Sequence, residues 1–241
     1  MPLFLLTFFI SGFCSLMYEV VWLRLAMGIF GVTAPFVSIF LSVFMAGLGL
    51  GSWGAGLLCK RLESKPASYA LRLYAGVEFL IALSSIAVPF LLTASRDAMT
   101  GAFGGAAQGS TGYYWASGLC TAMVLLPWCA CMGATFPLAM AAIGRRFKAQ
   151  ASNSFSYLYL ANVVGAGLGA VVSAFILIEL LGFRGTLYFG AGLNAVIAAV
   201  ALGASFQRSM GGAQAGTKAA IAAPHAASSA GTEALTLLFL S

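Results

Sequence analysis

The chain has 241 residues, of which 61% are hydrophobic and only 7% are charged. An ordinary soluble domain carries about 25% charged residues, so this composition excludes a typical water-soluble globular protein. The net charge of +6 does not indicate nucleic-acid binding, because the basic residues lie mainly in short connectors between apolar runs. Long apolar runs with basic connectors are typical of membrane-spanning helices, with the lipid bilayer as the main partner.

Six apolar runs are long enough to cross about 30 Å of hydrocarbon at about 1.5 Å per residue. We therefore predict an all-α integral membrane protein with about six transmembrane helices, forming one domain over residues 1–206. The first two runs are joined by only three residues and should form a tight antiparallel hairpin. The runs are Leu3 to Phe30, Ala34 to Cys59, Ala70 to Ala94, Tyr113 to Ile143, Phe155 to Leu181 and Gly185 to Phe206.

The orientation follows from the distribution of lysine and arginine. Nine basic residues flank or fill alternate connections, and only Arg96 and Arg184 lie on the other side. Cytoplasmic loops carry an excess of such residues, so the N-terminus is predicted to be cytoplasmic. The nine are Lys60, Arg61, Lys65, Arg72, Arg145, Arg146, Lys148, Arg208 and Lys218.

The composition changes after the sixth run. Residues 207–234 are rich in glycine, alanine, serine and threonine, which predicts a low-complexity cytoplasmic linker. Residues 235–241 are apolar again, and Thr236–Ser241 resembles Leu6–Ser11 near the start of the first run. We interpret 235–241 as the start of a further, truncated transmembrane helix.

Four charged residues lie inside the predicted spans: Glu19, Arg24, Glu78 and Glu179. Each costs about 2.5–3.5 kcal/mol on insertion scales, so each needs a partner or a purpose. One interpretation makes all four structural ties between helices, with Arg24 and Glu179 as an ion pair at similar depth. The other places Glu19 and Glu78 in a polar cavity that binds a proton or an organic cation such as a polyamine.

Aromatic and amide side chains can complete such a cation site. Tyr18 and Trp22 flank Glu19 in the first run, and Asn162 interrupts the fifth. Aromatic faces attract cations, and the amide supplies hydrogen bonds. We therefore include all three as candidate binding residues, although ordinary packing or interface anchoring is the better explanation of each aromatic residue taken alone.

Glycines recur every fourth residue in two of the runs. Gly47 and Gly51 form one stripe, and Gly165 and Gly169 form another. Small residues at this spacing allow helix backbones to approach closely in membranes. Both stripes lie inside apolar runs and follow no strand, so they are interpreted as helix-packing surfaces and not as phosphate-binding loops.

Catalytic and metal-binding patterns are absent from the sequence. There is no serine–histidine–acid set, and the five cysteines lack the spacing of a zinc site or a disulfide framework. The sequence predicts no catalytic residue, no metal and no cofactor.

Several motifs together resemble the membrane region of bacterial fused major-facilitator/spermidine-synthase-like proteins, the polyamine aminopropyltransferase-like family. The most specific is the run Tyr18-Glu-Val-Val-Trp-Leu-Arg24. The likeness extends from Phe9 to about Gly203. Its other motifs are Phe9–Phe13, Phe44–Ser52, Met132–Pro137 and Tyr159–Gly169.

The resemblance implies one half of a major-facilitator-like bundle in the bacterial cytoplasmic (inner) membrane, linked to a cytoplasmic synthase-like domain. The glycine-rich nucleoside motif and the aspartates of such a synthase are missing here, so aminopropyltransferase activity is not assigned to this chain. The leading hypothesis is a module that binds or transports a polyamine or another organic cation. The alternative is a non-transporting scaffold, or an accessory subunit that contacts other membrane subunits.

Overall fold

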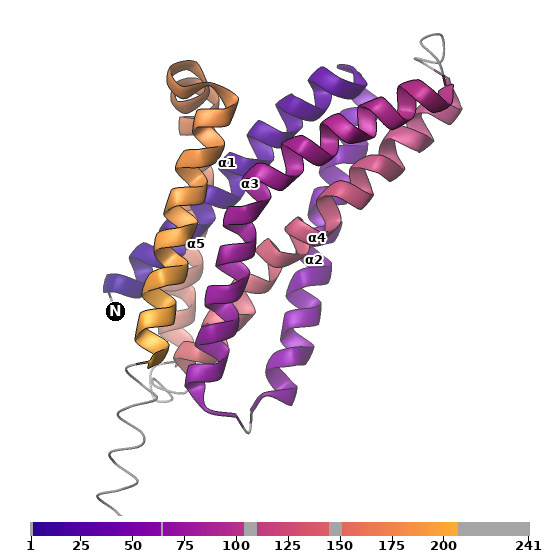
Figure 1. Cartoon of the computed structure of the whole chain (residues 1–241). Helices are drawn as coiled ribbons and strands as arrows, with labels where there is room; N and C mark the ends of the chain where they lie inside the picture. The colour runs from indigo at the N-terminus through magenta and orange to yellow at the C-terminus, as the bar shows by residue number, and fades with distance from the viewer. Residues whose placement is uncertain (1, 64, 104–109, 145–150, 207–241) are drawn as a thin grey trace, which may run out of the picture.

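The computed structural model describes residues 2–63, 65–103, 110–144 and 151–206, which are almost entirely helical (Figure 1). No strand occurs within these ranges, which confirms the predicted all-helical architecture. The predicted segments 207–234 and 235–241 lie outside the described residues. The helices are α1 (Pro2–Phe30), α2 (Ala34–Arg61), α3 (Ala67–Phe103), α4 (Thr111–Gly144) and α5 (Ala151–Val172), followed by a π-helical turn, Ser173–Leu177, and further helix to residue 206.

The turn between α1 and α2 shows how local chemistry sets the helix boundaries. Gly31 follows the last residue of α1 with φ of 106°, a conformation that glycine adopts without a Cβ clash. The Thr33 hydroxyl accepts a hydrogen bond from the Phe36 amide and caps α2, and Pro35 occupies the first turn of that helix. The predicted three-residue connection is therefore present, but α1 packs mainly on α5 and α2 mainly on α4, so the two helices do not form a closely packed hairpin.

Five helices in the described part of the chain are long and apolar enough to cross a membrane, against the six runs predicted. The difference arises in the last of them, a 52-residue helical stretch from Phe155 to Phe206. A straight helix of that length would extend about 78 Å, far more than a bilayer. Gly182 has φ of 68°, and Figure 1 shows the chain turning back at this end of the molecule.

Contacts with α1 show that this stretch has two antiparallel parts. Gly165 and Gly169 lie against the backbone of Phe9 and Phe13, so residues 155–181 run in the same direction as α1. Gly190 lies against Met17 and Tyr18, whereas later residues of the stretch line a cavity with the first turns of α1. We call residues 155–181 the first arm and residues 183–206 the second arm.

Helices α2 and α3 both pack on α4, and α1 packs on α5 (Figure 1). The interior contains large buried side chains such as Trp22, Phe40 and Leu125. The outer surface is also apolar: Phe90, Trp115 and other large hydrophobic side chains are mostly exposed. An apolar exterior of this extent fits a multi-pass membrane protein whose outer surface contacts lipid.

Candidate functional site

Among the residues that the structure describes, the most deeply buried charged side chain is Glu78 on α3, which has no exposed surface. The Ser11 hydroxyl of α1 donates a hydrogen bond of 2.9 Å to Glu78 Oε1. The Tyr74 hydroxyl, one turn earlier on α3, also hydrogen-bonds the carboxyl group. Glu78 Oε2 has no hydrogen-bond partner in the described residues, so part of the carboxyl group remains available to a ligand.

Helical spacing brings these groups together. Tyr74 and Glu78 are four residues apart on α3, and therefore lie on the same side of the helix. On α1, Tyr18 follows Ser11 by seven residues, or two turns, and shares its face. One face of α1 thus carries the hydroxyl groups that meet α3 and the second arm.

The second arm completes the buried polar cluster. Asn194 Nδ2 donates a hydrogen bond of 3.4 Å to the Tyr18 hydroxyl, while Asn194 Oδ1 has no partner among the described residues. Asn194 is 1% exposed. Tyr18 in turn lies within electrostatic range of Glu78. We therefore call Ser11, Tyr18, Tyr74, Glu78 and Asn194 the polar centre; it joins α1, α3 and the second arm and retains unused hydrogen-bonding capacity.

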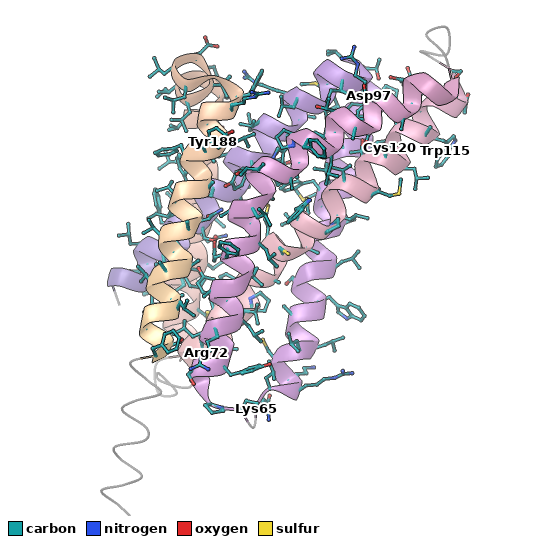
Figure 2. The ribbon with its side chains drawn as sticks, in the orientation of Figure 1. Lys65, Arg72, Asp97, Trp115, Cys120 and Tyr188 are labelled. Atoms are coloured by element: carbon teal, nitrogen blue, oxygen red, sulfur yellow. The ribbon has the colours of Figure 1, made fainter. Side chains whose placement is uncertain are left out.

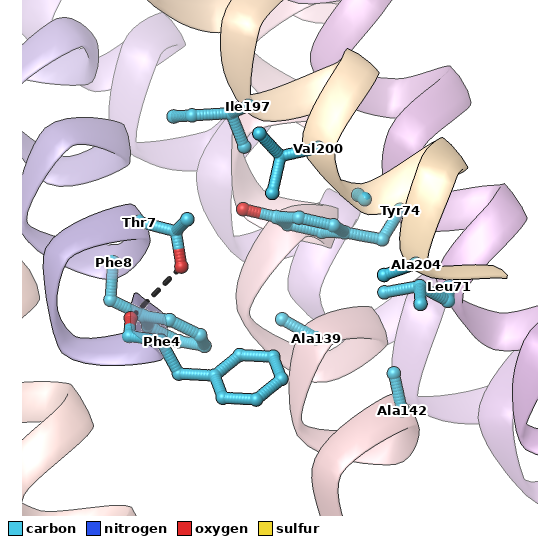
Figure 3. Close-up of a pocket in the computed structure, with 11 residues that line it drawn as sticks. Phe4, Thr7, Phe8, Leu71, Tyr74, Ala139, Ala142, Ile197, Val200 and Ala204 are labelled. Atoms are coloured by element: carbon cyan, nitrogen blue, oxygen red, sulfur yellow. Dashed lines mark hydrogen bonds between the residues drawn. The ribbon is translucent and has the colours of Figure 1, made fainter. Parts of the chain in front are cut away.

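Two cavities meet at Tyr74. One, with about 10 Å³ of water-accessible space, lies beside Ser11, Tyr74 and Asn162. The other has about 50 Å³ and is lined mainly by apolar side chains near the N-terminal end of α1 (Figure 3). Figure 3 shows Tyr74 extending into this second cavity beside Val200 of the second arm. Tyr74 and Phe8 line both cavities, so these two side chains lie between the apolar cavity and the smaller one beside Ser11.

Glu19 occupies a different part of the bundle. It lies eight residues beyond Ser11 on α1, about 12 Å along the helix axis, and within electrostatic range of Cys129 on α4. Glu19 is 6% exposed, and its Oε2 has no partner in the described chain. The structure therefore does not show Glu19 sharing the surroundings of Glu78.

Trp22 is fully buried one turn beyond Glu19, and its ring stacks on Tyr18 with centroids 5.3 Å apart. The Trp22 Nε1 donor also lacks a partner among described groups. Tyr18, one of the predicted binding residues, contacts both Asn194 and Trp22. It therefore connects the polar centre with the region around Trp22.

Asn162 lies on α5 against Gly12 of α1 and lines the smaller cavity with Ser11 and Tyr74. The structure therefore places this predicted residue beside the polar centre. Two tyrosines on the same helix, Tyr157 and Tyr159, differ from Asn162 in that their side chains are mostly exposed.

Arg24 has a backbone partner in this structure. Its Nη2 donates a hydrogen bond of 3.3 Å to the carbonyl oxygen of Ala174, within the π-helical turn Ser173–Leu177. Glu179, the predicted ion-pair partner, is exposed. The guanidinium group has five N–H donors and can serve more than one acceptor, and the Arg24–Glu179 pair stays a prediction.

The predicted glycine stripes lie at two helix seams. A Cβ at Gly51 would collide with the backbone of Ala130 on α4, and Gly47 lies against Cys129 of the same helix. Gly165 and Gly169 meet the α1 backbone, as described above. Gly133, which belongs to neither predicted stripe, makes an equivalent contact with Leu48.

Sequence reasoning also missed Ser11, Tyr74 and Asn194. Two signals were present: Tyr74 precedes Glu78 by one helical turn, and Asn194 is an amide inside an apolar run. Ser11 gave no signal, because a serine in a membrane helix commonly bonds its own backbone.

The chain is similar to a protein of known description. Over 205 residues, or 84% of its length, the chain is 30% identical to a protein described as polyamine aminopropyltransferase 2, from Streptomyces coelicolor strain A3(2). The chain spans about a third (34%) of the length of that relative. No family model matches the chain, and no solved structure matches it.

Proposed function

We propose that this chain is the membrane module of a spermidine-synthase-like protein and binds a polyamine or another organic cation at the polar centre. The observation that carries the proposal is Glu78, a fully buried carboxyl group with one oxygen unpartnered in the described chain. A buried carboxylate without a cation is costly, and a protonated amine offers both the charge and the hydrogen-bond donors that it lacks.

The surroundings of Glu78 suit an alkylammonium group. The hydroxyl groups of Ser11 and Tyr74 bind the carboxyl group, and the Asn194 amide has a free acceptor oxygen among described groups. The nearby cavity is lined mainly by apolar side chains, which fit the methylene segments between amino groups. The name of the Streptomyces relative includes the word polyamine, which is consistent with this ligand class.

Access to Glu78 requires a conformational change. The cavity next to Ser11 has about 10 Å³ of water-accessible space, which is room for one water molecule and not for a diamine. We propose that the Tyr74 side chain swings to join the two cavities when the cation enters. We extend this proposal from binding to transport of the cation. In this extended proposal the chain is part of a major-facilitator-like bundle in a bacterial inner membrane, and its N-terminus is cytoplasmic.

The closed state of this site also favours the second candidate, a scaffold that anchors a synthase-like domain or another membrane subunit without moving a ligand. Glu78 has no exposed surface, and Glu19 very little. In that role the buried carboxyl groups tie helices together by hydrogen bonds, as Glu78 does with Ser11.

A binding titration separates the two functions. We would measure equilibrium binding of putrescine and spermidine to the purified full chain in detergent, using Glu78→Gln and, as a matched control, Glu179→Gln on the exposed surface. The proposal predicts saturable binding that weakens at least about tenfold in Glu78→Gln and is unchanged in Glu179→Gln. If the folded wild-type protein binds neither amine, the scaffold function replaces the proposal.

A further inference from the structure

A third, separate cavity of about 420 Å³ opens between α3 and the second arm. It is lined by residues near Pro89 on α3 and by Arg184, Leu187 and Tyr188 just after the turn at Gly182. Figure 2 labels Tyr188 close to this end of the second arm, away from the N-terminus. In Figure 1 the upper half of α3 leans away from the second arm, as expected for a helix with an internal proline.

The floor of this cavity has unused polar groups. Ser85 is only 2% exposed, yet its hydroxyl group has no hydrogen-bond partner in the described chain. Pro89, four residues later, lacks an N–H group, so the Ser85 carbonyl loses its usual helical donor as well. Neighbouring Ser84, by contrast, bonds the Ile81 carbonyl of its own helix. Ser85 therefore offers both a donor and an acceptor to a molecule in the cavity.

The charge of the cavity is positive. Arg184 lines it, and no acidic residue does so within the described chain. The second arm begins at this point, and the N-terminal end of a helix also favours negative charge. A planar guanidinium group binds phosphate oxygens by paired hydrogen bonds, so the ligand most complementary to this arrangement carries a phosphate group.

The rim of the cavity is apolar and continues into the outer surface. Phe90 is 72% exposed, Ile86 is 60% exposed and Tyr188 is 58% exposed. These side chains would lie beside the acyl chains of a lipid while Arg184 lies near the end of the bundle, at the depth of a headgroup. A free phosphate ion would make no use of this apolar rim.

We propose that the cavity between α3 and the second arm binds a phospholipid, with the headgroup phosphate on Arg184 and Ser85 and an acyl chain along Ile86 and Phe90. The site is independent of the polar centre, because none of its lining residues belongs to that cluster. It is a specific lipid site at the end of the bundle opposite the N-terminus.

The test measures binding of a tail-labelled phosphatidylglycerol to the purified full chain in detergent micelles, with the equally labelled diacylglycerol as the phosphate-free probe. We expect the wild type to prefer the phospholipid by about tenfold, the size of one charge-assisted contact. Arg184→Gln should abolish the preference, and Ser85→Ala should reduce it about threefold.

Two matched variants control for general effects. Arg96→Gln removes a positive charge toward the same end of α3, and Ser84→Ala removes a buried hydroxyl group one residue from Ser85; both should leave the preference unchanged. The proposal is overturned if Arg184→Gln keeps the wild-type preference, or if Arg96→Gln reduces it equally. It is also overturned if inorganic phosphate alone binds and displaces the labelled lipid, since the site would then be one for a free oxyanion.

Discussion

The glycine seams and the polar centre are both buried contacts between helices, but they differ in what they leave unused. At the seams, Gly51 and Gly165 lie against the backbone of a neighbouring helix and no space remains. At the polar centre, Glu78 Oε2 and Asn194 Oδ1 have no partner in the described chain, and a small cavity lies beside Ser11 and Tyr74. The glycine seams therefore stabilise the packing of the helices, whereas the polar centre has hydrogen-bonding atoms that the fold itself does not use.

The largest effect should come from filling a seam. Gly165→Leu places a side chain against the Phe9 carbonyl of α1, so α1 and the first arm must separate. We expect a loss of about 3 kcal/mol or more, enough to prevent recovery of folded monodisperse protein after purification. Gly167→Leu is the matched control, because a Cβ there meets open space. Equal recovery of the two variants, measured by size-exclusion chromatography in detergent, would show that the seam is not a tight contact.

A smaller change tests the second seam. Gly51→Ala adds one methyl group against the Ala130 backbone and should destabilise the protein by about 1–3 kcal/mol. Gly49→Ala faces open space and should be neutral or stabilising by up to about 1 kcal/mol, because alanine favours the helix. Thermal unfolding in detergent compares the two variants. A lower unfolding midpoint for Gly49→Ala than for Gly51→Ala would contradict the tight contact at Gly51.

At the polar centre the expected effects are on binding and not on folding. Tyr74→Phe removes the hydroxyl group that bonds Glu78 but keeps the ring between the two cavities. Spermidine affinity should fall about fivefold, since one hydrogen bond to a charged group is lost. Tyr157→Phe, on the exposed surface of α5, provides the control. A loss of affinity shared by both variants would point to a general effect of tyrosine removal.

The smallest effect is expected at Ser11. Ser11→Ala removes the 2.9 Å hydrogen bond to Glu78 Oε1 and should weaken spermidine binding about threefold, because the Tyr74 hydroxyl remains. Ser15→Ala removes a hydroxyl group that bonds the Ser11 carbonyl within α1, and should not change the affinity. An unchanged affinity in Ser11→Ala would place the amine elsewhere.

Features that depend on local sequence could be predicted well. Helices α1, α2 and α4 follow the apolar runs closely, whereas α3 continues beyond the predicted end at Ala94 to Phe103. The reversal at Gly182 falls between the fifth and sixth runs. Contacts between distant residues could not be predicted: Ser11 and Glu78 are 67 positions apart, and Asn194 joins Tyr18 across 176. Sequence spacing gives the face of one helix but not which neighbour covers it. Spacing therefore offers Glu19 and Glu78 as candidates for one site, and a ligand shared by the two stays a prediction.

The central claim is that an amine occupies the polar centre at Glu78. A carboxyl-reactive carbodiimide, applied to the full chain in detergent and followed by mass spectrometry, reports on Glu78 and on exposed Glu179 in the same sample. We expect spermidine to slow modification of Glu78 several-fold while Glu179 reacts at an unchanged rate. Equal rates at Glu78 with and without spermidine, in protein shown to be folded and reactive at that residue, would contradict the claim.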